Sequence, residues 1–382
     1  MKYIKLGELC NIVSGGTPSR TKSEYWNNGT IPWIKIGNIK SKYVNEADEF
    51  ITEKGLQFSS AKLLPKGTLL YTIFATLGEC GILGIEACTN QAIAGLTIKE
   101  PENIFSEYIY YFLKSKKNDV TFLGRGVAQN NINLSMLRNF LVPVPSLTVQ
   151  NAIINLLAKV ECVIKLRKNE LELLDNLIKA RFVEMFENVT YRKVPLIETI
   201  REGAGLSYGI VVPGNNVKNG IPMIRPSDFK NSTLDLSNVY KVEPEIECKY
   251  AKTRLLGDEI LVQVIGQPGQ VMLATDQCRG MNVTRNLAVI RPNHKIINRY
   301  YLKQYIEKED SQQQLLKNTK QSTLKQLPLS LLKKLEIQVP PIDLQNQFAD
   351  FVQQVDKSKV VVQKSLDQAQ LLFDSLMQQY FG

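Results

Sequence analysis

The sequence predicts an α/β (α+β) fold, in which two tandem-repeat mixed α/β domains are separated by two long antiparallel coiled-coil helices related by a pseudo-twofold axis. Three observations support this prediction. The chain of 382 residues repeats itself at half its length, strand-like runs fill the first part of each repeat, and a long helical stretch fills the second part. Together they indicate the tandem duplication of one large unit.

The repeat is visible as short matching segments that keep their order along the chain. Residues 31–35 (IPWIK) match residues 221–225 (IPMIR), and an Asn-Gly pair precedes each copy. The other matches are residues 64–70 with 255–261, 142–145 with 339–341, and Gln150-Asn151 with Gln345-Asn346. The offset drifts from 190 to 195, close to half of 382, which is too long for a short-period solenoid.

The first part of each repeat, about 145–150 residues long, predicts a mixed α/β domain with a twisted sheet. Residues 69–74 and 260–265 are apolar runs rich in β-branched or aromatic side chains, which favour strands. Gly and Asn separate these runs. A helix is expected over residues 106–114, after the strands.

The second part of each repeat predicts one long helix. Residues 148–187 contain no Gly or Pro, and Pro145 and Pro341 precede the two helices as start signals. Apolar residues recur at alternating gaps of 4 and 3, with Arg167 and Lys359 at the position that each helix skips. This spacing favours a coiled coil; an ordinary amphipathic helix on its own domain is the alternative. The helices should pair antiparallel, because both seams are apolar and the two domains must return to opposite ends. The predicted helix-pairing residues are Ile153, Leu157, Val160, Ile164, Leu171, Leu174 and Ile178 in the first helix, and Phe348, Val352, Val355, Val362, Leu366, Phe373 and Leu376 in the second.

The pattern divides the chain into four parts with different charge. The expected domains are residues 1–146 and 188–339, and the expected helices are residues 147–187 and 340–382. The first domain has 16 basic and 12 acidic side chains (+4), and the second has 22 and 14 (+8). The helices have 6 and 6 (zero) and 3 and 5 (−2). A basic excess confined to the two domains indicates two polyanion-binding heads on a neutral spacer.

Several kinds of chemistry lack their sequence signals. The chain has no P-loop motif for ATP, no Asn/Asp-Pro-Pro-aromatic motif for adenine methylation, and no Cys pair spaced for zinc. His294 is the only histidine and is expected in a solvated loop, so a catalytic triad is not expected. Asp235, Glu247 and Lys249 loosely match a nuclease metal site, but such a pattern arises easily on a charged surface. We therefore expect no catalytic residue and no metal ligand in this chain.

Composition indicates a soluble, cytoplasmic protein. Apolar residues make up 44% and charged residues 22% of the chain, as in globular proteins. The sequence has no uninterrupted apolar run of about 18–20 residues and no signal-like start, so no membrane association is expected.

The motifs resemble those of the specificity (S) subunit of type I restriction–modification systems. The resemblance extends over both repeats and rests on an ordered set of segments: residues 14–19 (SGGTPS), 25–34 (YWNNGTIPWI), 64–70 (LPKGTLL), 130–134 (NNINL) and the Pro-Val-Pro entry to a long helix. The second copy departs from the pattern. Residues 202–205 (EGAG) lack the Thr-Pro-Ser ending, Met223 replaces the tryptophan, and residues 320–324 (KQSTL) replace NNINL.

The resemblance implies a function in reading DNA. Such subunits hold two target recognition domains apart on two antiparallel helices and read an asymmetric, bipartite site in double-stranded DNA with an unread gap. They bind two methyltransferase subunits and also motor-nuclease subunits. S-adenosylmethionine, ATP and Mg²⁺ are then expected on those partners, and no cofactor is expected in this chain. A metal-dependent nuclease acting alone and a coiled-coil adaptor that binds only proteins are the alternatives.

The side chains that read base edges and phosphates are mainly Arg, Lys, Asn, Gln and Ser. The candidate DNA-binding residues are Arg20, Lys22, Lys35, Asn38, Lys40, Arg125, Gln129, Asn130 and Asn131 in the first domain, and Arg225, Ser227, Lys230, Gln267, Arg279, Arg285, Lys320 and Gln321 in the second. Trp26 and Trp33 are expected to anchor loops, and Gly15, Gly16 and Gly266 to serve turns. The helix length predicts an unread gap of about 5–8 base pairs between the half-sites.

Overall fold

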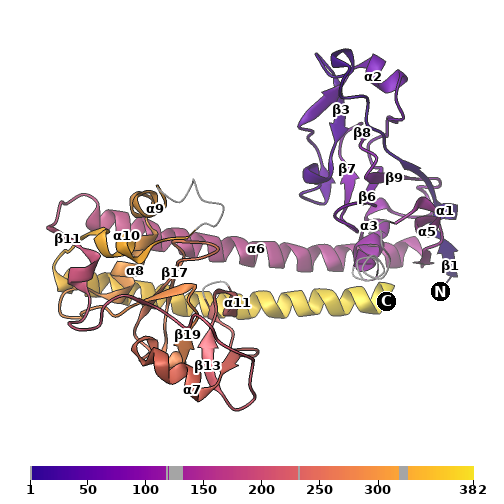
Figure 1. The fold of residues 1–382 in the computed structure, drawn as a ribbon. Coiled ribbons are helices and arrows are strands. Elements are labelled where there is room, and N and C mark those ends of the chain that lie inside the picture. Colours follow the sequence, from indigo (N-terminus) through magenta and orange to yellow (C-terminus); the bar gives the residue numbers. More distant parts are fainter. Residues whose placement is uncertain (1, 118, 120–131, 231–232, 318–325) are drawn as a thin grey trace. The chain divides into compact units, whose positions relative to one another are not determined.

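The computed structural model describes residues 2–117, 119, 132–230, 233–317 and 326–382 (Figure 1). It divides into two compact units, one made of residues 1–168 and 364–382 and the other of residues 169–363. Each unit combines one globular part with segments of two long helices. We call the globular parts head 1, from strand β1 to strand β10, and head 2, from strand β11 to strand β21.

Head 1 is built on two sheets whose central strands are mostly apolar. Leu69, Leu70 and Tyr71 are fully buried, as expected for a strand covered on both faces. The first sheet has the order β2 (Cys10–Ser14), β9 (Ile93–Ile98), β6 (Leu69–Thr72), β7 (Cys80–Leu83) and β4 (Tyr43–Val44). The second has the order β5 (Glu49–Ile51), β3 (Ile31–Ile34) and β8 (Cys88–Thr89). The pairs β4·β7 and β3·β8 are parallel and the other pairs are antiparallel, so the sheet is mixed.

Head 2 repeats this topology, with four strands in its first sheet where head 1 has five. Its first sheet has the order β12 (Ser207–Tyr208), β20 (Leu287–Ile290), β17 (Ile260–Gln263) and β18 (Val271–Leu273). Its second has the order β16 (Tyr240–Val242), β13 (Ile221–Ile224) and β19 (Asn282–Val283), and β13·β19 is again the parallel pair. A hairpin of β14 (Phe229–Lys230) and β15 (Thr233–Leu234) is added. The register therefore confirms the repeat seen in the sequence.

Short helices and a two-stranded ribbon complete each head. The helices of head 1 are α1 (Leu6–Leu9), α2 (Glu53–Gln57), α3 (Ser106–Ser115) and α5 (Leu134–Arg138). Those of head 2 are α7 (Pro244–Glu247), α8 (Arg299–Glu307), α9 (Glu309–Leu316) and α10 (Leu329–Lys334). The ribbons pair β1 (Lys2–Lys5) with β10 (Leu141–Val144), and β11 (Lys193–Pro195) with β21 (Glu336–Gln338). Each ribbon joins the start of a head to the strand that leads into a long helix.

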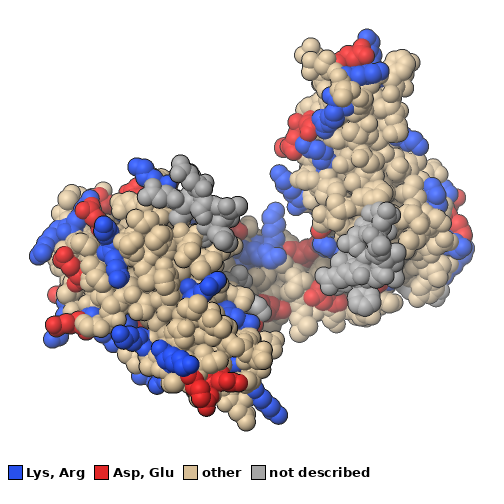
Figure 2. Space-filling view, viewed as in Figure 1, with Lys and Arg blue, Asp and Glu red and all other residues tan. Residues whose placement is uncertain are grey.

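Charged side chains do not by themselves mark one site. In Figure 2, Lys and Arg side chains are spread over the visible faces of both units, with Asp and Glu between them. A net positive charge attracts a polyanion over a distance, but it does not specify which groups are read. The site has to be found from how the loops are held.

The two long helices are α6 (Leu147–Phe186) and α11 (Ile342–Phe381), and they pair antiparallel as predicted. In the second unit, the ring of Phe348 at the start of α11 lies 5.5 Å from that of Phe182 near the end of α6. Further along, Lys359 forms an ion pair with Asp175 at 2.6 Å. In the first unit, α3 contacts both the end of α11, through Tyr111 and Phe373 at 6.5 Å, and the first half of α6.

Most residues of the predicted seam are buried in the structure. The buried members are Ile153, Leu157, Val160, Ile164, Ile178, Phe348, Val352, Val355, Val362, Leu366 and Phe373. Leu171 and Leu174 are half-buried. Leu376 was predicted to continue the second seam but is only half-buried, and Met377 is buried instead. The spacing changes from alternating 4 and 3 to successive steps of 4, because the partner there is the head and no longer the other helix alone.

Among the described residues, α6 is long and apolar enough to cross a membrane by length and composition. An 18-residue window has a mean hydropathy of 1.4, and 22% of it is buried. Core helices of soluble proteins share this length and composition. Packing accounts for part of the apolar character of α6, because Ile153 and Leu157 are buried against the rest of the first unit.

A buried glutamine fixes each long helix to its head. Gln150 is fully buried, and its Nε2 donates to Pro145 O at 2.9 Å and to Asn103 O at 3.2 Å. Its Oε1 accepts a hydrogen bond from Phe105 N at 3.1 Å. The equivalent bonds of buried Gln345 are with Pro340 O at 2.8 Å, Ile296 O at 3.2 Å and Asn298 N at 2.8 Å. The match of Gln150 with Gln345 in the sequence therefore reflects one structural role in both repeats.

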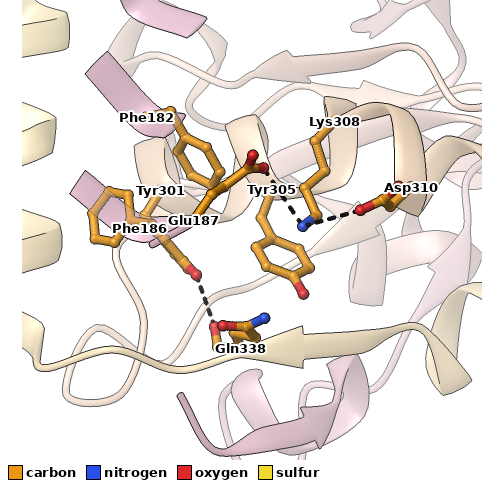
Figure 3. Close-up of a pocket in the computed structure, with 8 residues that line it drawn as sticks. All are labelled: Phe182, Phe186, Glu187, Tyr301, Tyr305, Lys308, Asp310 and Gln338. Carbon is orange, nitrogen blue, oxygen red and sulfur yellow. Dashed lines mark hydrogen bonds and ion pairs between the residues drawn. The ribbon is translucent and has the colours of Figure 1, made fainter. Parts of the chain in front are cut away.

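Aromatic side chains hold the far end of each helix against a head, and Figure 3 shows them in the second unit. In the second unit, the ring of Tyr301 on α8 stacks on Phe182 at 5.4 Å and meets Phe186 at 4.7 Å. The Tyr301 hydroxyl donates to Gln338 O at 2.9 Å, next to a cavity of about 210 Å³. The counterpart in the first unit is Tyr108, which donates to Pro143 O at 2.8 Å and packs on Phe381 at 5.2 Å.

Candidate nucleic-acid interface

The loops of each head converge at one end of its first sheet. Because β2, β9, β6 and β7 are antiparallel neighbours, β2 and β6 finish at the same end where β9 and β7 begin. We call this the loop end. It comprises residues 15–22, 35–40, 73–78 and 90–92 in head 1, and residues 209–214, 225–230, 264–270 and 284–286 in head 2. The turns after β3 and β13 belong to it because β3 runs parallel to β8 and β13 to β19.

The Gly-Gly pair of head 1 allows a close approach between loops. A Cβ on Gly15 would lie 2.3 Å from Thr89 O, and one on Gly16 would lie 2.3 Å from the Ser60 carbonyl carbon. Gly16 N donates to Thr89 O at 2.8 Å. Both glycines are therefore required by packing, and neither has a positive φ.

The structure corrects the assignment of this motif in head 2. The sequence match had paired residues 202–205 with the Gly-Gly motif. The equivalent position is Gly209-Ile210, since Ile210 N donates to Val283 O at 2.7 Å just as Gly16 does to Thr89. Gly203 and Gly205 instead adopt positive φ angles of 72° and 58°, as turn residues do.

Two tryptophans anchor the first loop of head 1, as predicted. The Nε1 of buried Trp33 donates to Gly16 O at 2.9 Å, and that of Trp26 donates to Ser19 O at 3.1 Å. The two rings meet edge to face with centroids 5.1 Å apart. The backbone of the loop is therefore fixed at two points.

Arg20 and Lys35 share one carboxylate at this loop. Arg20 Nη2 and Lys35 Nζ each lie 2.5 Å from an oxygen of Glu49, and the Arg20 guanidinium lies 3.7 Å from the Trp26 ring centroid. The Lys35 ammonium, with Arg20, holds the pKa of the Glu49 carboxyl below its usual value, against the opposing effect of burial. Two cations for one anion leave a net positive charge, and the Arg20 side chain is 52% exposed.

The other head 1 candidates differ in how free they are to bind DNA. Asn38 is used by the fold, because its Oδ1 accepts a hydrogen bond from Lys35 N at 2.8 Å and caps a short turn. Lys22 is exposed and donates to the Tyr25 hydroxyl at 3.0 Å. Lys40 is exposed just beyond the capped turn.

Head 2 builds the corresponding position from different side chains. Arg225, at the position of Lys35, forms an ion pair with Asp228 at 2.7 Å and also lies 5.6 Å from the Tyr240 ring centroid. Asp228 also caps the turn, accepting from Arg225 N at 2.8 Å, as Asn38 does in head 1. Tyr240 replaces Glu49, since each pairs with the matching residue of the neighbouring strand. Ser227 is exposed within this turn.

The turn between β6 and β7 in head 1 and the turn between β17 and β18 in head 2 both contain a residue with positive φ. Ala75 in head 1 has a φ of 61° and Gly266 in head 2 has a φ of 91°, the left-handed region that favours glycine. Gly266 thus serves a turn, as predicted. The candidate Gln267 follows it and is exposed.

The turn between β8 and β9 carries a residue that the sequence reading missed. Arg285, a candidate in head 2, is exposed at the apex of the turn between β19 and β20. Gln91 occupies the same place in head 1 and is also exposed. Residues 89–93 (TNQAI) and 283–287 (VTRNL) have equal length at an offset of 194, and extending the repeat alignment to them would have found Gln91.

The structure does not bring all candidates together. Arg279 follows β18, which ends beside the start of β17, so it lies at the opposite end of the sheet from Gln267. It is ion-paired with Asp276 at 3.2 Å. Arg125, Gln129, Asn130, Asn131, Lys320 and Gln321, and the side chain of Lys230, lie outside the described residues.

Glu247, a member of the loose nuclease pattern, has a structural role. Glu247 is buried and forms an ion pair with Arg254, and Asn282 Nδ2 donates to it at 2.9 Å. The Arg254 guanidinium lowers the pKa of the Glu247 carboxyl more than burial raises it. Within the described ranges no group of three or more His, Cys, Asp or Glu is arranged to hold a metal ion. Lys249, with Lys252, instead lines a hollow of about 370 Å³ beside β12.

Each head presents exposed Arg, Lys or Gln side chains on a fixed backbone at its loop end. This arrangement is typical of proteins that bind nucleic acid. The model of the family described as "Type I restriction modification DNA specificity domain" matches residues 1–176 and 214–369. The chain belongs to this family and contains two copies of the domain. It is a non-catalytic DNA-recognition component of a type I restriction–modification system.

Relatives with curated names agree with this assignment. The EcoBI specificity subunit of Escherichia coli is 23% identical over 416 aligned positions, which cover 98% of this chain and 83% of that protein. The MjaIX specificity subunit of Methanocaldococcus jannaschii is 30% identical over 189 residues, 48% of this chain and 42% of that protein. The EcoR124I/EcoR124II specificity subunit of Escherichia coli is 29% identical over 165 residues, 42% of this chain and 40% of that protein. In the last two alignments the chain thus spans less than half of the relative.

Solved structures share the fold along the whole chain. The S subunit from M. genitalium matches with a TM-score of 0.53 and 14% identity, covering 100% of this chain and 96% of that chain. A chain from a study of complex assembly and conformational transition of the type I R-M system matches with a TM-score of 0.58 and 18% identity, covering 100% and 97%.

Proposed function

We propose that the chain reads an asymmetric, bipartite site in double-stranded DNA, with one half-site for each head and an unread gap between them. Residues 1–146 and 188–339 act as target recognition domains, and residues 147–187 and 340–382 act as spacer helices. One observation carries the proposal: the two loop ends have the same backbone frame but different exposed side chains. Exposed Gln91 corresponds to exposed Arg285, and beside them half-buried Lys35 corresponds to half-buried Arg225. Two heads with the same backbone frame and different side chains suit two different half-sites.

The candidate residues at the loop ends are the proposed DNA contacts. Lys and Arg side chains such as Arg20, Lys22 and Lys40 suit phosphates. The candidates outside the described residues remain proposed contacts as well. The described residues that follow these candidates support the proposal, because Ile132 N donates to Ile73 O at 3.1 Å and Leu327 N donates to Val264 O at 2.8 Å. Both bonds bring the chain to a loop end. Arg279 is left out because it lies at the other end of the sheet.

Apolar residues on the outer faces of the helices support docking of partner proteins. In α6, Val149, Leu156 and Val163 are exposed at a spacing of seven residues, and Leu173 is 67% exposed. In α11, Leu371 is 71% exposed. A seven-residue spacing places side chains on one helix face. These faces suit two methyltransferase subunits, with motor-nuclease subunits joining the same assembly in the cytoplasm and no membrane contact. S-adenosylmethionine, ATP and Mg²⁺ would then act on those partners.

The division between heads and spacer can be tested by shortening both helices by one heptad. Deleting residues 165–171 and 360–366 leaves untouched Glu161, which binds Tyr111 of head 1 at 2.7 Å. Seven residues span about 10 Å of helix, or about three base pairs of DNA. We expect the gap, predicted at about 5–8 base pairs, to shorten while both half-sites keep their bases. Mapping of methylated adenines by the assembled complex measures both quantities.

The matched control exchanges residues 188–339 for the head of another family member. It should change one half-site and leave the gap unchanged. If the heptad deletion altered the bases that are read, the proposed division would be wrong. A chain that formed complexes with proteins but bound no DNA would support the adaptor alternative.

A further inference from the structure

The apex of the turn between β8 and β9 is an exposed position of head 1 whose backbone is held by four hydrogen bonds. Asn90 N donates to Ile34 O at 3.0 Å, and Ile93 N closes the turn onto Asn90 O at 3.2 Å. The Asn90 side chain accepts from Ala92 N at 3.1 Å, an Asx turn that fixes the backbone locally. Ile73 N donates to Ala92 O at 2.8 Å, which ties the turn to the end of β6.

Head 2 reproduces each of these four bonds with different residues. Thr284 takes the place of Asn90, and its side chain accepts from Asn286 N at 3.3 Å. The backbone bonds are Thr284 N to Ile224 O at 3.0 Å, Leu287 N to Thr284 O at 3.0 Å and Val264 N to Asn286 O at 2.8 Å. Arg285 N adds a bond to Ile210 O at 2.9 Å. The apex side chain is therefore the variable part of a fixed platform.

The two apex side chains differ in the bases that they suit. The amide of glutamine offers a donor and an acceptor that match adenine N7 and N6 in the major groove, whereas the guanidinium of arginine offers two donors that match guanine N7 and O6. In head 1 the Thr17 hydroxyl donates to Gln91 Oε1, which fixes the amide orientation. One lone pair of that oxygen and both Nε2 hydrogens remain for a base. In head 2 Val211 follows Ile210 where Thr17 follows Gly16, and it has no hydroxyl to donate.

We propose that Gln91 and Arg285 are the specificity-determining residues at the centre of the two loop ends, Gln91 reading an adenine in one half-site and Arg285 reading a guanine in the other. This inference rests on the DNA-reading function proposed above. A fixed backbone below the apex lowers the cost of ordering the side chain on DNA, and the convergence of three loops around it makes the apex central to the surface.

The test is selection from a library of randomised double-stranded DNA by the full chain assembled with its methyltransferase subunits. We compare the original chain with Arg285→Gln, Arg285→Lys, Gln91→Arg and Arg279→Gln. Arg285→Gln should lose one guanine preference, by about ten- to a hundred-fold, and leave the other half-site unchanged. Gln91→Arg should change one position of the other half-site from adenine to guanine. Arg279→Gln, an exposed arginine at the far end of the sheet, should change no position.

Arg285→Lys separates base reading from phosphate contact. Lysine keeps the charge but loses the paired donors, so guanine preference should fall while the salt dependence of binding is retained. If Arg285→Gln weakened binding to all sequences equally, Arg285 would be a phosphate contact and the inference would be wrong. If Arg285→Gln kept the guanine preference, another residue would read that base, and the inference would also be wrong. Enrichment of no sequence by the original chain would instead overturn the proposed function itself. Equal melting temperatures of all chains show that folding is not the cause.

Discussion

Head 1 and head 2 hold their loop ends with the same main-chain hydrogen bonds and present different side chains on them. Gly16 and Ile210 donate from the same backbone position at 2.8 and 2.7 Å, although one is glycine and the other is not. At the apex of the neighbouring turn, glutamine in one head stands where the other has Arg285. Main-chain bonds do not depend on the side chain, so a duplicated head can change what it presents without losing its frame.

The heads differ also in which helix end supports them. Head 2 is packed on the end of α6, through Phe182 and Phe186, whereas head 1 is packed on the end of α11, through Phe373 and Phe381. The pattern is the same, but its parts come from opposite ends of the chain. A change at equivalent positions of the two helices should therefore act on different units.

The largest expected effect is at Phe348, which is fully buried in the aromatic cluster of the second unit. Phe348→Ala should lower the free energy of unfolding by about 3–5 kcal/mol, because it leaves a cavity among the rings. Hydrogen exchange should speed up in α8 of head 2 more than in α3 of head 1. The matched variant Ile153→Ala, 195 residues earlier, should affect the first unit instead. Equal acceleration in both heads for either variant would break the comparison.

A smaller effect is expected at the buried glutamines. Gln345→Leu removes the amide that bonds three backbone groups, which are left without partners in the interior. The loss should be about 1–3 kcal/mol, measured by urea unfolding. Gln150→Leu should lose a similar amount, since it makes the same three bonds in the first unit. A difference of more than about 2 kcal/mol between the two losses would show that the buried glutamine does not have the same structural role in both repeats.

The smallest expected effect is a pH-dependent change at the Glu49 site of head 1. The folded-state pKa of Glu49 lies below the ordinary 4.5, chiefly because of the Lys35 ammonium. Its contribution to stability is therefore fully present above pH 4.5 and is lost as pH falls through the lower folded pKa. Trp26 and Trp33, the two tryptophans of the chain, report on this site by fluorescence. Their emission should change below pH 4.5 as Arg20 is released.

Glu49→Gln should abolish that transition, whereas the nearby control Glu53→Gln should keep it. Tyr240 replaces Glu49 in head 2, so no carboxyl titrates at the equivalent position. An acid transition that survives in Glu49→Gln would assign it to another group.

The repeat and the long helices could be predicted from sequence because they rest on period. Side chains such as Ile153 and Leu157 are buried at the positions that alternating gaps of 4 and 3 require. At Leu376 the pattern changes, because the helix meets a head there: Leu376 is half-buried, Met377 is buried, and the buried residues follow in successive steps of 4. A pattern identifies the face of a helix, but it does not identify the partner that covers it.

The loop end was predicted less completely, for a physical reason. Asn38 has the chemistry of a base-reading residue, yet the fold uses it to cap a turn. Gly209 escaped notice because its role depends on a strand that is distant in sequence, and a Cβ there would lie 1.9 Å from Val283 O. Gln91 is a single exposed residue in a short turn, which no local pattern distinguishes. Residue type limits what a side chain can do, while tertiary contacts decide what it does.

The discontinuity of the first unit has a consequence for synthesis. Residues 1–168 reach their full set of contacts only when residues 364–382 arrive, because Phe373 and Phe381 pack on α3. At about 5–20 residues per second on the ribosome, the intervening segment takes roughly 10–40 s to emerge. During that interval the rings of Tyr108, Tyr111 and Phe112 lack their contacts with α11. The second unit is continuous from residue 169 to 363, so its synthesis is completed first. The amino-terminal half of the chain is therefore the last to mature, the reverse of the usual order in nascent multidomain proteins.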